Sequence, residues 1–435
     1  MLKAIARDWN EFWFRPRASG PLGVLRMAIG LLTMACLIQQ WPDRFAFYAD
    51  DGVLPRSLVP QFTAIFTPGP RPINPLMATT SHAVITVFFV VFLLTAFTLT
   101  IGFWSRTSVF LCAVFLNALH NRDPIMNSTG GDCVMLITCL YLMLAPCGAS
   151  CSVDRLIRIL RGREGDDAPK VVPWAWRLAQ VQVSICYLTT FLLKMPGDLW
   201  QNGTAVYYPA ALPEFHRFPM PWMDGNHIWW INILTYGTLA IELALGTLIW
   251  VPRLRLYVLA LGVVLHLGIE YSMNIPLFGA LMVASYTSFL QQSDLEWLRQ
   301  RMPRWIRLGR LKLVYDGECD FCRSCLLVIR FLDVFRAVTF YDYQHPDELA
   351  ESGGVRYEDA DEAAIAVDER GRQYAGYYAF REVARRTPAL WLLVPILYVP
   401  GVPALGRGAY AWIATHRKYL PVAPRYKSSQ PTVSV

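Results

Sequence analysis

Long apolar segments follow one another from residue 22 to residue 291, and they exclude an ordinary soluble fold for this part of the chain. A helix needs about 20 residues to cross the hydrocarbon core of a bilayer. Eight segments approach this length: 22–40, 82–103, 108–120, 132–147, 175–195, 228–250, 256–272 and 274–291. Only 17% of the whole chain is charged, against about 25% in a typical soluble domain. We therefore expect a polytopic α-helical membrane bundle of about eight helices.

The distribution of basic residues predicts how this bundle is oriented. Eighteen Lys and Arg residues fall in the connections on the side of the N-terminus, and five fall on the opposite side. Cytoplasmic loops are the positively charged ones, so we expect an even number of spans in the cell inner membrane, with both termini in the cytoplasm. Residues 1–21 are polar and basic, and no cleavable signal peptide is expected there. Because the net charge of +7 is spread between apolar segments, the expected partner is a lipid bilayer and not nucleic acid.

A redox-type cysteine pair follows the apolar region. The strand-like run 311–315 leads through Asp316 to Cys319 and Cys322, which open a segment of helical periodicity. A strand that feeds a helix beginning with Cys-x-x-Cys is typical of thioredoxin-like folds, where the helix N-terminus favours a thiolate on the first cysteine. We expect Cys319 to attack a disulfide and Cys322 to resolve the mixed disulfide.

The rest of the C-terminal region alternates between strand and helix patterns. Strands are predicted at 311–316, 337–343, 363–368 and 372–375, and helices at 322–335 and 377–386. This order predicts a small thioredoxin-like α/β domain after the membrane bundle. The apolar stretch 390–399 contains Pro395 and is too short to cross a membrane, so a buried or interfacial helix is expected there. The expected parts are a membrane domain at 1–291, a basic interfacial linker at 292–311, the α/β domain at 312–420 and a disordered tail at 421–435.

Cys325 adds a third sulfur one helical turn after Cys322. Three cysteines at this spacing also suit a zinc ion or an iron–sulfur cluster, with His345 as a remote fourth ligand. No second Cys or His pair accompanies them in the sequence. A redox dithiol is therefore favoured over a metal site and over a purely structural role, and no metal ligand is assigned.

Among the ionisable residues within the apolar segments we single out six: Arg26, Asp132, Lys194, Glu242, His266 and Glu270. Charges in hydrocarbon are costly, so each of them is a functional candidate. In the predicted orientation Asp132, Lys194 and Glu270 lie at the outer ends of their segments, and His266 shares a helix face with Glu270. A desolvated lysine can act as a general base. The alternatives are snorkelling of Lys194 to the interface and hydrogen bonding between helices for the other groups.

This apolar region resembles the HTTM domain family, which is related to the vitamin K-dependent gamma-carboxylase. The matching positions are Arg26, Trp41, Tyr48–Pro55, His120–Pro124, Gly130–Asp132, Tyr187, Lys194, Trp200–Ala205, His266, Glu270 and Pro276–Gly279. In the carboxylase a lysine seven residues after a tyrosine deprotonates a quinol, and Lys194 follows Tyr187 at that spacing. The resemblance therefore implies that Lys194 is a base. It also implies a lipid quinone or quinol as cofactor, whereas the residues alone specify none.

The C-terminal region resembles the DCC family of thiol-disulfide oxidoreductases. The matching positions are Tyr315–Cys322, Tyr374–Phe380, Pro395, Pro400, Tyr410 and Ile413–Arg417. This resemblance implies thiol-disulfide exchange with an unidentified protein partner, with Asp316 supporting the dithiol. Three functions remain open. They are a membrane-anchored thiol-disulfide oxidoreductase coupled to a carboxylase-like membrane site, a carboxylase-like or quinol-dependent enzyme that uses Lys194, and a non-catalytic transporter or assembly scaffold.

Overall fold

The computed structural model describes residues 2–66, 74–124, 130–165, 169–213, 215–218, 220, 223, 225–305 and 308–417. The chain divides into two compact units. The membrane unit comprises residues 1–154 and 168–291, and the C-terminal unit comprises residues 155–167 and 292–435. The predicted tail at 421–435 lies outside the described residues, and the predicted boundaries of the linker stay predictions.

Helices occupy the positions of the eight apolar segments. They are α2 (Gly20–Gln40), α5 (His82–Ile101), α6 (Ser105–Arg122), α7 (Gly130–Leu144), α9 (Trp174–Lys194), α12 (Ile228–Gly246), α13 (Arg255–Ser272) and α14 (Phe278–Tyr286). Among the described residues, α2, α5, α12 and α13 are long and apolar enough to cross a membrane, and α7 is a shorter apolar helix, as is α14 together with the turn that follows it. The predicted membrane bundle is confirmed, while the number of spans stays a prediction.

Short elements connect these helices. The helices are α1 (Leu2–Phe14), α3 (Arg44–Tyr48), α4 (Val59–Phe66), α8 (Val153–Leu160), α10 (Asp198–Gln201) and α11 (Tyr207–Ala211). The single turns of 3-10 helix are η1 (Pro75–Met77), η2 (Gly225–His227), η3 (Leu248–Trp250) and η4 (Thr287–Phe289). Two short strands, β1 (Arg17–Ala18) and β2 (Lys170–Val171), pair in antiparallel orientation.

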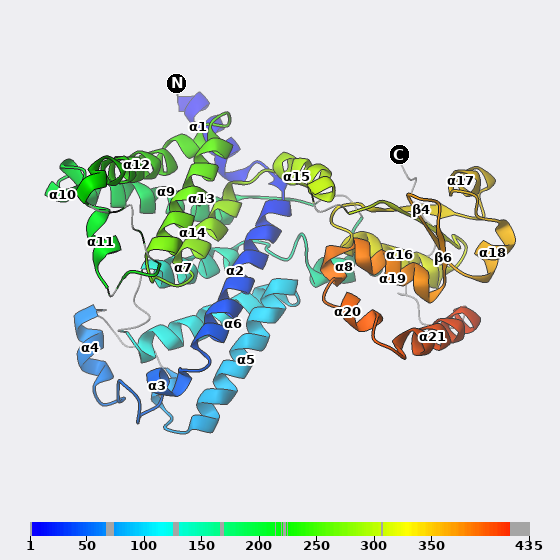
Figure 1. Cartoon of the computed structure of the whole chain (residues 1–435), viewed down its shortest axis with the longest axis horizontal. Coiled ribbons are helices and arrows are strands. Elements are labelled where there is room, and N and C mark those ends of the chain that lie inside the picture. The colour runs from blue at the N-terminus through cyan, green and yellow to red at the C-terminus, as the bar shows by residue number, and fades with distance from the viewer. Residues whose placement is uncertain are drawn as a thin grey trace. The chain divides into compact units, whose positions relative to one another are not determined.

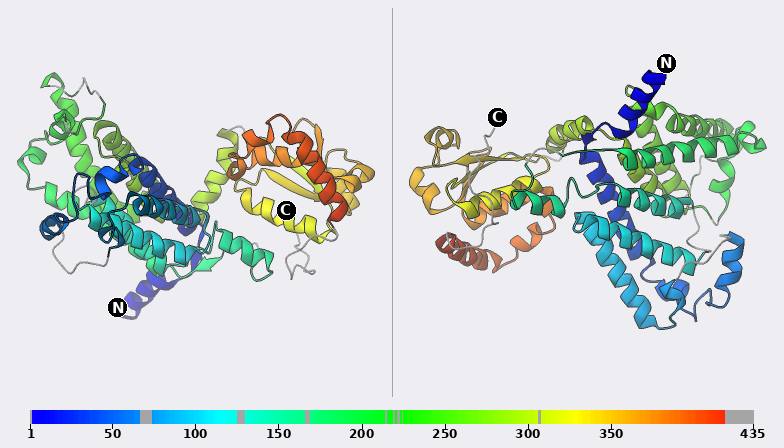
Figure 2. Two further views of the ribbon diagram at one scale, coloured as in Figure 1. Left: turned by 90° about the horizontal axis from the view of Figure 1, so that it is seen from below. Right: turned by 180° about the vertical axis from the view of Figure 1, so that it is seen from behind.

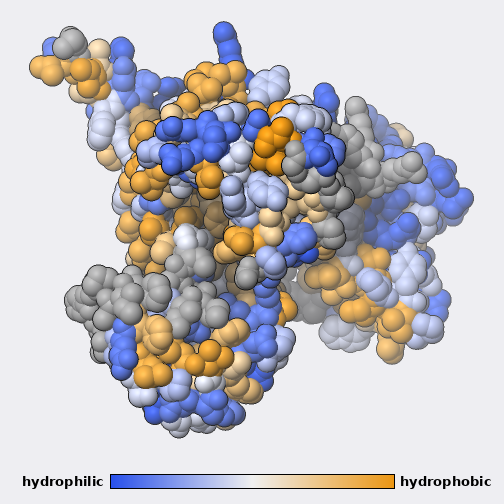
Figure 3. All heavy atoms as spheres, turned by 60° about the vertical axis from the view of Figure 1, so that its left-hand side comes forward, coloured by the Kyte–Doolittle hydropathy of each residue, from blue (hydrophilic) through white to orange (hydrophobic). Residues whose placement is uncertain are grey.

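The membrane unit buries its core between helices and exposes hydrophobic side chains on its outside. Helix α2 packs along α5, α5 packs against α6, and α9 packs against α12 (Figures 1 and 2). The outer face of α5 carries large side chains that are 41–60% exposed: Val84, Val87, Val90, Val91, Leu94 and Phe97. Hydrophobic residues gather in broad patches on the face shown in Figure 3. Such patches are unfavourable in water and favourable in lipid.

Arg26 is completely buried in α2 and connects it to the ends of other helices. Its guanidinium donates hydrogen bonds to the carbonyl oxygens of Thr100, Cys147, Ser150 and Cys151. Gly102 follows α5 with a φ of +70°, and a Cβ there would lie 2.4 Å from Nη1 of Arg26. Because the guanidinium satisfies backbone carbonyls, Arg26 has a structural role.

The C-terminal unit contains a four-stranded mixed sheet. The elements of this unit, in chain order, are α15 (Gln292–Trp305), β3 (Leu311–Tyr315), α16 (Asp320–Leu332), β4 (Val338–Asp342), α17 (Pro346–Glu351), α18 (Tyr357–Glu362), β5 (Ile365–Asp368), β6 (Gln373–Ala375), α19 (Tyr377–Arg386), η5 (Pro388–Leu390), α20 (Val394–Leu397) and α21 (Val402–His416). The strand order is β4-β3-β5-β6. Strand β4 is parallel to β3, and β5 and β6 continue the sheet in antiparallel pairs. The predicted thioredoxin-like α/β domain is confirmed.

Helices cover both faces of this sheet. On one face Leu313 packs with Ile329 of α16 and Val383 of α19. On the other face Val314 packs with Ala360 of α18 and, through the same cluster, with Leu349 of α17. The β-α-β connection from β3 through α16 to β4 therefore places the start of α16 directly after the end of β3 (Figure 1).

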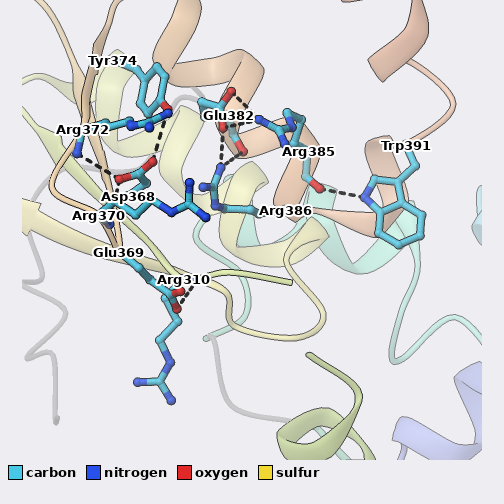
Figure 4. A network of polar contacts seen from close by, with 10 residues as sticks. All are labelled: Arg310, Asp368, Glu369, Arg370, Arg372, Tyr374, Glu382, Arg385, Arg386 and Trp391. Carbon is cyan, nitrogen blue, oxygen red and sulfur yellow. Dashed lines mark hydrogen bonds and ion pairs between the residues drawn. The ribbon is translucent and has the colours of Figure 1, made fainter. Parts of the chain in front are cut away.

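A polar network fixes the end of α19 (Figure 4). The buried carboxylate of Glu382 pairs with Arg385 and Arg386 at 3.0 Å and 2.6 Å. The indole Nε1 of Trp391 donates to the carbonyl oxygen of Arg385 at 2.9 Å. Asp368 accepts the backbone N–H groups of Arg370 and Arg372 in the turn between β5 and β6. These contacts hold the segment after α19 against the domain.

Two of the predicted elements differ in the structure. Helix α16 begins at Asp320 instead of residue 322, because Cys319 is its N-cap. The continuous helix predicted at 390–399 is wrong: the stretch contains the last residue of η5 and the four-residue α20, because Pro395 removes a backbone donor and Gly401 (φ +94°) follows the stretch. Leu392 in this stretch is 90% exposed, so the segment is not buried in this unit, and its predicted interfacial position stays a prediction.

The predicted linker contains α15. In this helix the guanidinium of Arg301 lies 4.9 Å from the ring centroid of the exposed Trp297. Stacked Arg and Trp side chains suit a membrane interface. The interfacial position of the linker stays a prediction.

Candidate functional site

A tight turn presents the dithiol between β3 and α16. Asp342 at the end of β4 accepts hydrogen bonds from the backbone N–H groups of Gly317 and Gln344, both at 3.0 Å. A Cβ on Gly317 would lie 1.7 Å from Oδ2 of Asp342, so no larger residue fits there. Sequence reasoning missed Asp342, although its place at the end of the parallel strand beside β3 was a usable signal.

Cys319 is the N-cap of α16, and its Sγ accepts the backbone N–H of Cys322 at 3.3 Å. The pKa of Cys319 is lowered to about 6, chiefly by the hydrogen bond from the Cys322 side chain. The backbone N–H of Cys322 acts in the same direction, and burial opposes both. A thiol with this pKa is about 90% thiolate at pH 7. Cys319 therefore has the ionisation state of an attacking nucleophile.

The other two sulfurs of the motif are protonated at neutral pH. The pKa of Cys322 is raised far above its ordinary value by its hydrogen bond to Cys319 and by burial. Burial raises the pKa of Cys325 to about 11. All three cysteines are half-buried free thiols. The three sulfurs therefore differ in ionisation, with one thiolate and two neutral thiols.

Two charged residues beside the dithiol act on Cys319 in opposite directions. Asp316 accepts the backbone N–H of Glu318 at 3.0 Å, and its Oδ2 lies 3.5 Å from Nη2 of Arg417. The Asp316 carboxylate raises the pKa of Cys319, and the Arg417 guanidinium lowers it. Arg417 directly follows α21, so the C-terminal helix contributes a cation to a site built from the β3–α16 turn.

The alternative of a metal site requires a cluster of ligand side chains. Within the described ranges, no group of three or more His, Cys, Asp or Glu side chains is arranged to hold a metal ion. Nε2 of His345 lies 3.8 Å from Oδ2 of Asp342. His345 therefore sits against the carboxylate that shapes the turn.

In the membrane unit, the structure brings four of the predicted residues into contacts between α9, α12 and α13. Lys194 forms an ion pair with Glu242, and its Nζ lies 5.0 Å from the ring centroid of Trp200. Tyr187 Oη lies 2.6 Å from Nε2 of His266. Tyr187 Oη also lies 2.5 Å from Oη of Tyr286 in α14, a residue that sequence reasoning missed.

The two remaining predicted residues have partners of their own. Oε1 of Glu270 lies 2.6 Å from Nη1 of Arg217, and its Oε2 accepts the backbone N–H of Gly279 at 3.2 Å. Oδ1 of Asp132 lies 3.8 Å from Nε2 of His120. Glu270 therefore joins α13 to the start of α14, and Asp132 joins α7 to α6.

Comparison with known proteins agrees with both parts of the chain. The family model described as HTTM domain matches residues 14–297, which is more than half of the chain. The model described as DCC1-like thiol-disulfide oxidoreductase matches residues 313–422.

One curated relative is the Sporulation-delaying protein SdpB of Bacillus subtilis (strain 168), which is 32% identical over 120 residues. That match covers 26% of this chain and 36% of the relative, so the chain spans about a third of the relative's length. No solved structure matches. The chain therefore belongs to the HTTM domain family and carries, in the same polypeptide, a DCC1-like thiol-disulfide oxidoreductase domain.

Proposed function

We propose that the protein is a membrane-anchored thiol-disulfide oxidoreductase that works through Cys319 and Cys322. The observation that carries the proposal is the capping of α16 by Cys319, whose Sγ accepts the N–H of Cys322. This contact stabilises the thiolate and places the second sulfur one turn away. The match of this region to a thiol-disulfide oxidoreductase family supports the same conclusion.

Exchange proceeds in two balanced steps. The Cys319 thiolate attacks one sulfur of a partner disulfide, and the second partner sulfur leaves as a thiolate. Cys322 then loses its proton and attacks Sγ of Cys319, which releases the first partner sulfur and leaves an internal disulfide. The hydrogen bond and charge of Cys319 are the main reasons for the raised pKa of Cys322. Once Cys319 is in the mixed disulfide, this cause disappears and Cys322 ionises more readily.

Purified full-length protein tests the proposal. We expect the reduced protein to convert glutathione disulfide to glutathione, and Cys319→Ser to abolish the reaction. Cys322→Ser should accumulate a mixed disulfide on Cys319, which mass spectrometry detects. Cys133→Ser, an exposed cysteine of the membrane unit, is the matched control and should react like the wild type. Unchanged turnover in Cys319→Ser would refute the proposal.

A second function, a carboxylase-like or quinol-dependent reaction in the membrane unit, is supported by two buried atoms. Oε2 of Glu242 and Nδ1 of His266 have no hydrogen-bond partner in the structure, and both residues are more than nine-tenths buried. Buried polar atoms are almost always paired, so these two suit a bound polar group. In this proposal Lys194 is the base, and its ion-pair partner Glu242 is the group to which its proton can pass.

Variants of Cys319 and Lys194 distinguish thiol-disulfide exchange from the membrane reaction. Consumption of duroquinol by the Cys319→Ser protein supports the membrane reaction if Lys194→Ala stops it and Lys170→Ala, outside the long helices, does not. If neither Cys319 nor Lys194 is needed in cells that depend on the protein, a transporter or scaffold remains.

We place the protein in the inner membrane with both termini, and hence the dithiol, in the cytoplasm. The basic residues between the apolar segments support this orientation. A membrane-impermeant maleimide should label Cys319 only after the cells are permeabilised.

A further inference from the structure

A cavity of about 380 Å³ lies beside the dithiol within the C-terminal unit. Its walls come from α16, β3, α19 and α21, and include Phe321, Cys322, Leu326, Phe380, Ile413 and Ala414. Cys322 lines this cavity, whereas Cys319 is not among its described wall residues. An occupant of the cavity therefore lies against Cys322, one helical turn from the Cys319 thiolate.

The polar groups on the cavity wall are already paired with the protein. Oη of Tyr410 accepts the backbone N–H of Ala364 at 2.9 Å, and Oη of Tyr377 donates to the carbonyl oxygen of Leu397 at 2.8 Å. Asp316 and Arg417 pair with each other. Apart from the thiols of Cys322 and Cys325, the remaining walls are aliphatic and aromatic, so the cavity favours an apolar occupant.

The position of the cavity points to a side chain of the partner protein. A disulfide attacked by Cys319 must lie at the start of α16, so the residues next to the partner's cysteine pass over Cys322 and the cavity. The volume is near the lower end of the range of about 300–1,000 Å³ for binding pockets, which suits one or two large side chains. The N–H of Ala364, just before β5, is occupied by Tyr410, so a partner's backbone cannot bind there without displacing it.

We propose that this cavity binds a bulky apolar side chain adjacent to the partner's cysteine, so that the protein selects disulfides in apolar segments. The inference rests on the proposed thiol-disulfide exchange and names its substrate class. The partner disulfide is reduced to two thiols while Cys319 and Cys322 form one disulfide, so no further reactant is needed. Hydrophobic pockets discriminate by about 10–200-fold. We expect at least a tenfold preference.

Two peptides that differ at one position test this selectivity. Each carries a single cysteine as a mixed disulfide with glutathione, and the residue next to it is Trp in one peptide and Ser in the other. The rate constant for reduction by the reduced full-length protein should be at least about tenfold higher for the Trp peptide. Ala414→Phe fills the cavity and should bring the ratio of the two rate constants close to one. Ala411→Phe, three residues earlier on α21 and exposed, should keep the preference.

The outcomes distinguish this inference from the function on which it rests. Equal rates for both peptides, with Cys319 reactive, would overturn the selectivity and leave the exchange activity intact. No reaction with either peptide would overturn both. If Ala414→Phe is misfolded, Ala409→Leu at the exposed edge of the cavity makes a smaller change, and an unchanged preference in that folded variant would also contradict the inference. Slower oxidation by duroquinone in either variant, with unchanged peptide preference, would assign the cavity to a small molecule instead.

Discussion

Replacing Cys322 by alanine should raise the pKa of Cys319, because the Cys322 side chain donates the hydrogen bond that contributes most to the lowered value of about 6. A hydrogen bond to a charged group contributes about 1.5–3 kcal/mol. At 1.36 kcal/mol per pKa unit, its loss corresponds to about 1–2 units. Cys319 is half-buried, so water replaces part of the lost interaction. We expect the lower end of this range, a midpoint near pH 7 instead of pH 6. The backbone N–H of residue 322 is retained in the variant.

Alkylation by iodoacetamide between about pH 4 and pH 9 measures this midpoint, because only the thiolate reacts. Trypsin cleaves after Lys312 and Arg323, and the resulting peptide contains Cys319 as its single cysteine in the Cys322→Ala protein. In the wild type, fragment ions locate the adduct on Cys319 or Cys322. A wild-type midpoint at the ordinary cysteine value of about 8.5 would refute the reasoning, and so would a variant midpoint that stays at or below that of the wild type.

Three further changes test other parts of the structure. Gly317→Ala should lower the exchange rate at least tenfold, because its Cβ would collide with Asp342. The control Gly309→Ala, where a Cβ would have no atom closer than 3.6 Å, should keep the wild-type rate. Equal rates for the two variants would contradict the close approach of Asp342 to Gly317. Arg417→Met should raise the pKa of Cys319 through loss of a nearby positive charge, so the rate of Cys319 alkylation at pH 6 should fall. An unchanged pH profile of Cys319 alkylation would show that this charge is screened. Lys194→Met should lower the free energy of unfolding in detergent by about 3 kcal/mol, because it leaves the Glu242 carboxylate buried and unpaired. Adding Glu242→Gln should restore part of this lost stability, which thermal unfolding measures. Additive losses in the double variant would argue against the ion pair.

The dithiol motif and the order of strands and helices along the C-terminal unit could be predicted because both depend on local sequence. The Asp-Gly turn, the cysteine spacing and the short strand patterns each occupy a few consecutive residues around Cys319. The support from Asp342 and the wall of the cavity formed by α21 could not be read in this way, because Asp342 lies 23 residues after Cys319 and the wall residues from Gly406 to Arg417 lie 87 to 98 residues after it. The helix predicted at 390–399 is wrong because the prediction gave more weight to the apolar composition of the stretch than to Pro395, which interrupts helical hydrogen bonding.

The positions of the membrane helices were likewise visible in hydrophobicity alone, whereas their polar contacts were not. Lys194 and Glu242 were singled out one by one, but their pairing depends on how α9 packs against α12. Tyr286 carried no signal of its own, because a tyrosine in an apolar helix is ordinary, and its contact with Tyr187 appears only in the packed bundle.

The most direct test of the central claim is the thiol-disulfide state of the tryptic peptide 313–323 after the full-length protein is equilibrated in glutathione buffers of increasing oxidising strength. We predict that Cys319 and Cys322 lose two hydrogens together and form one internal disulfide, while Cys325, in the next peptide, stays a thiol. A pair that remains reduced in fully oxidising buffer, or a disulfide that forms with Cys325 instead, would contradict the account.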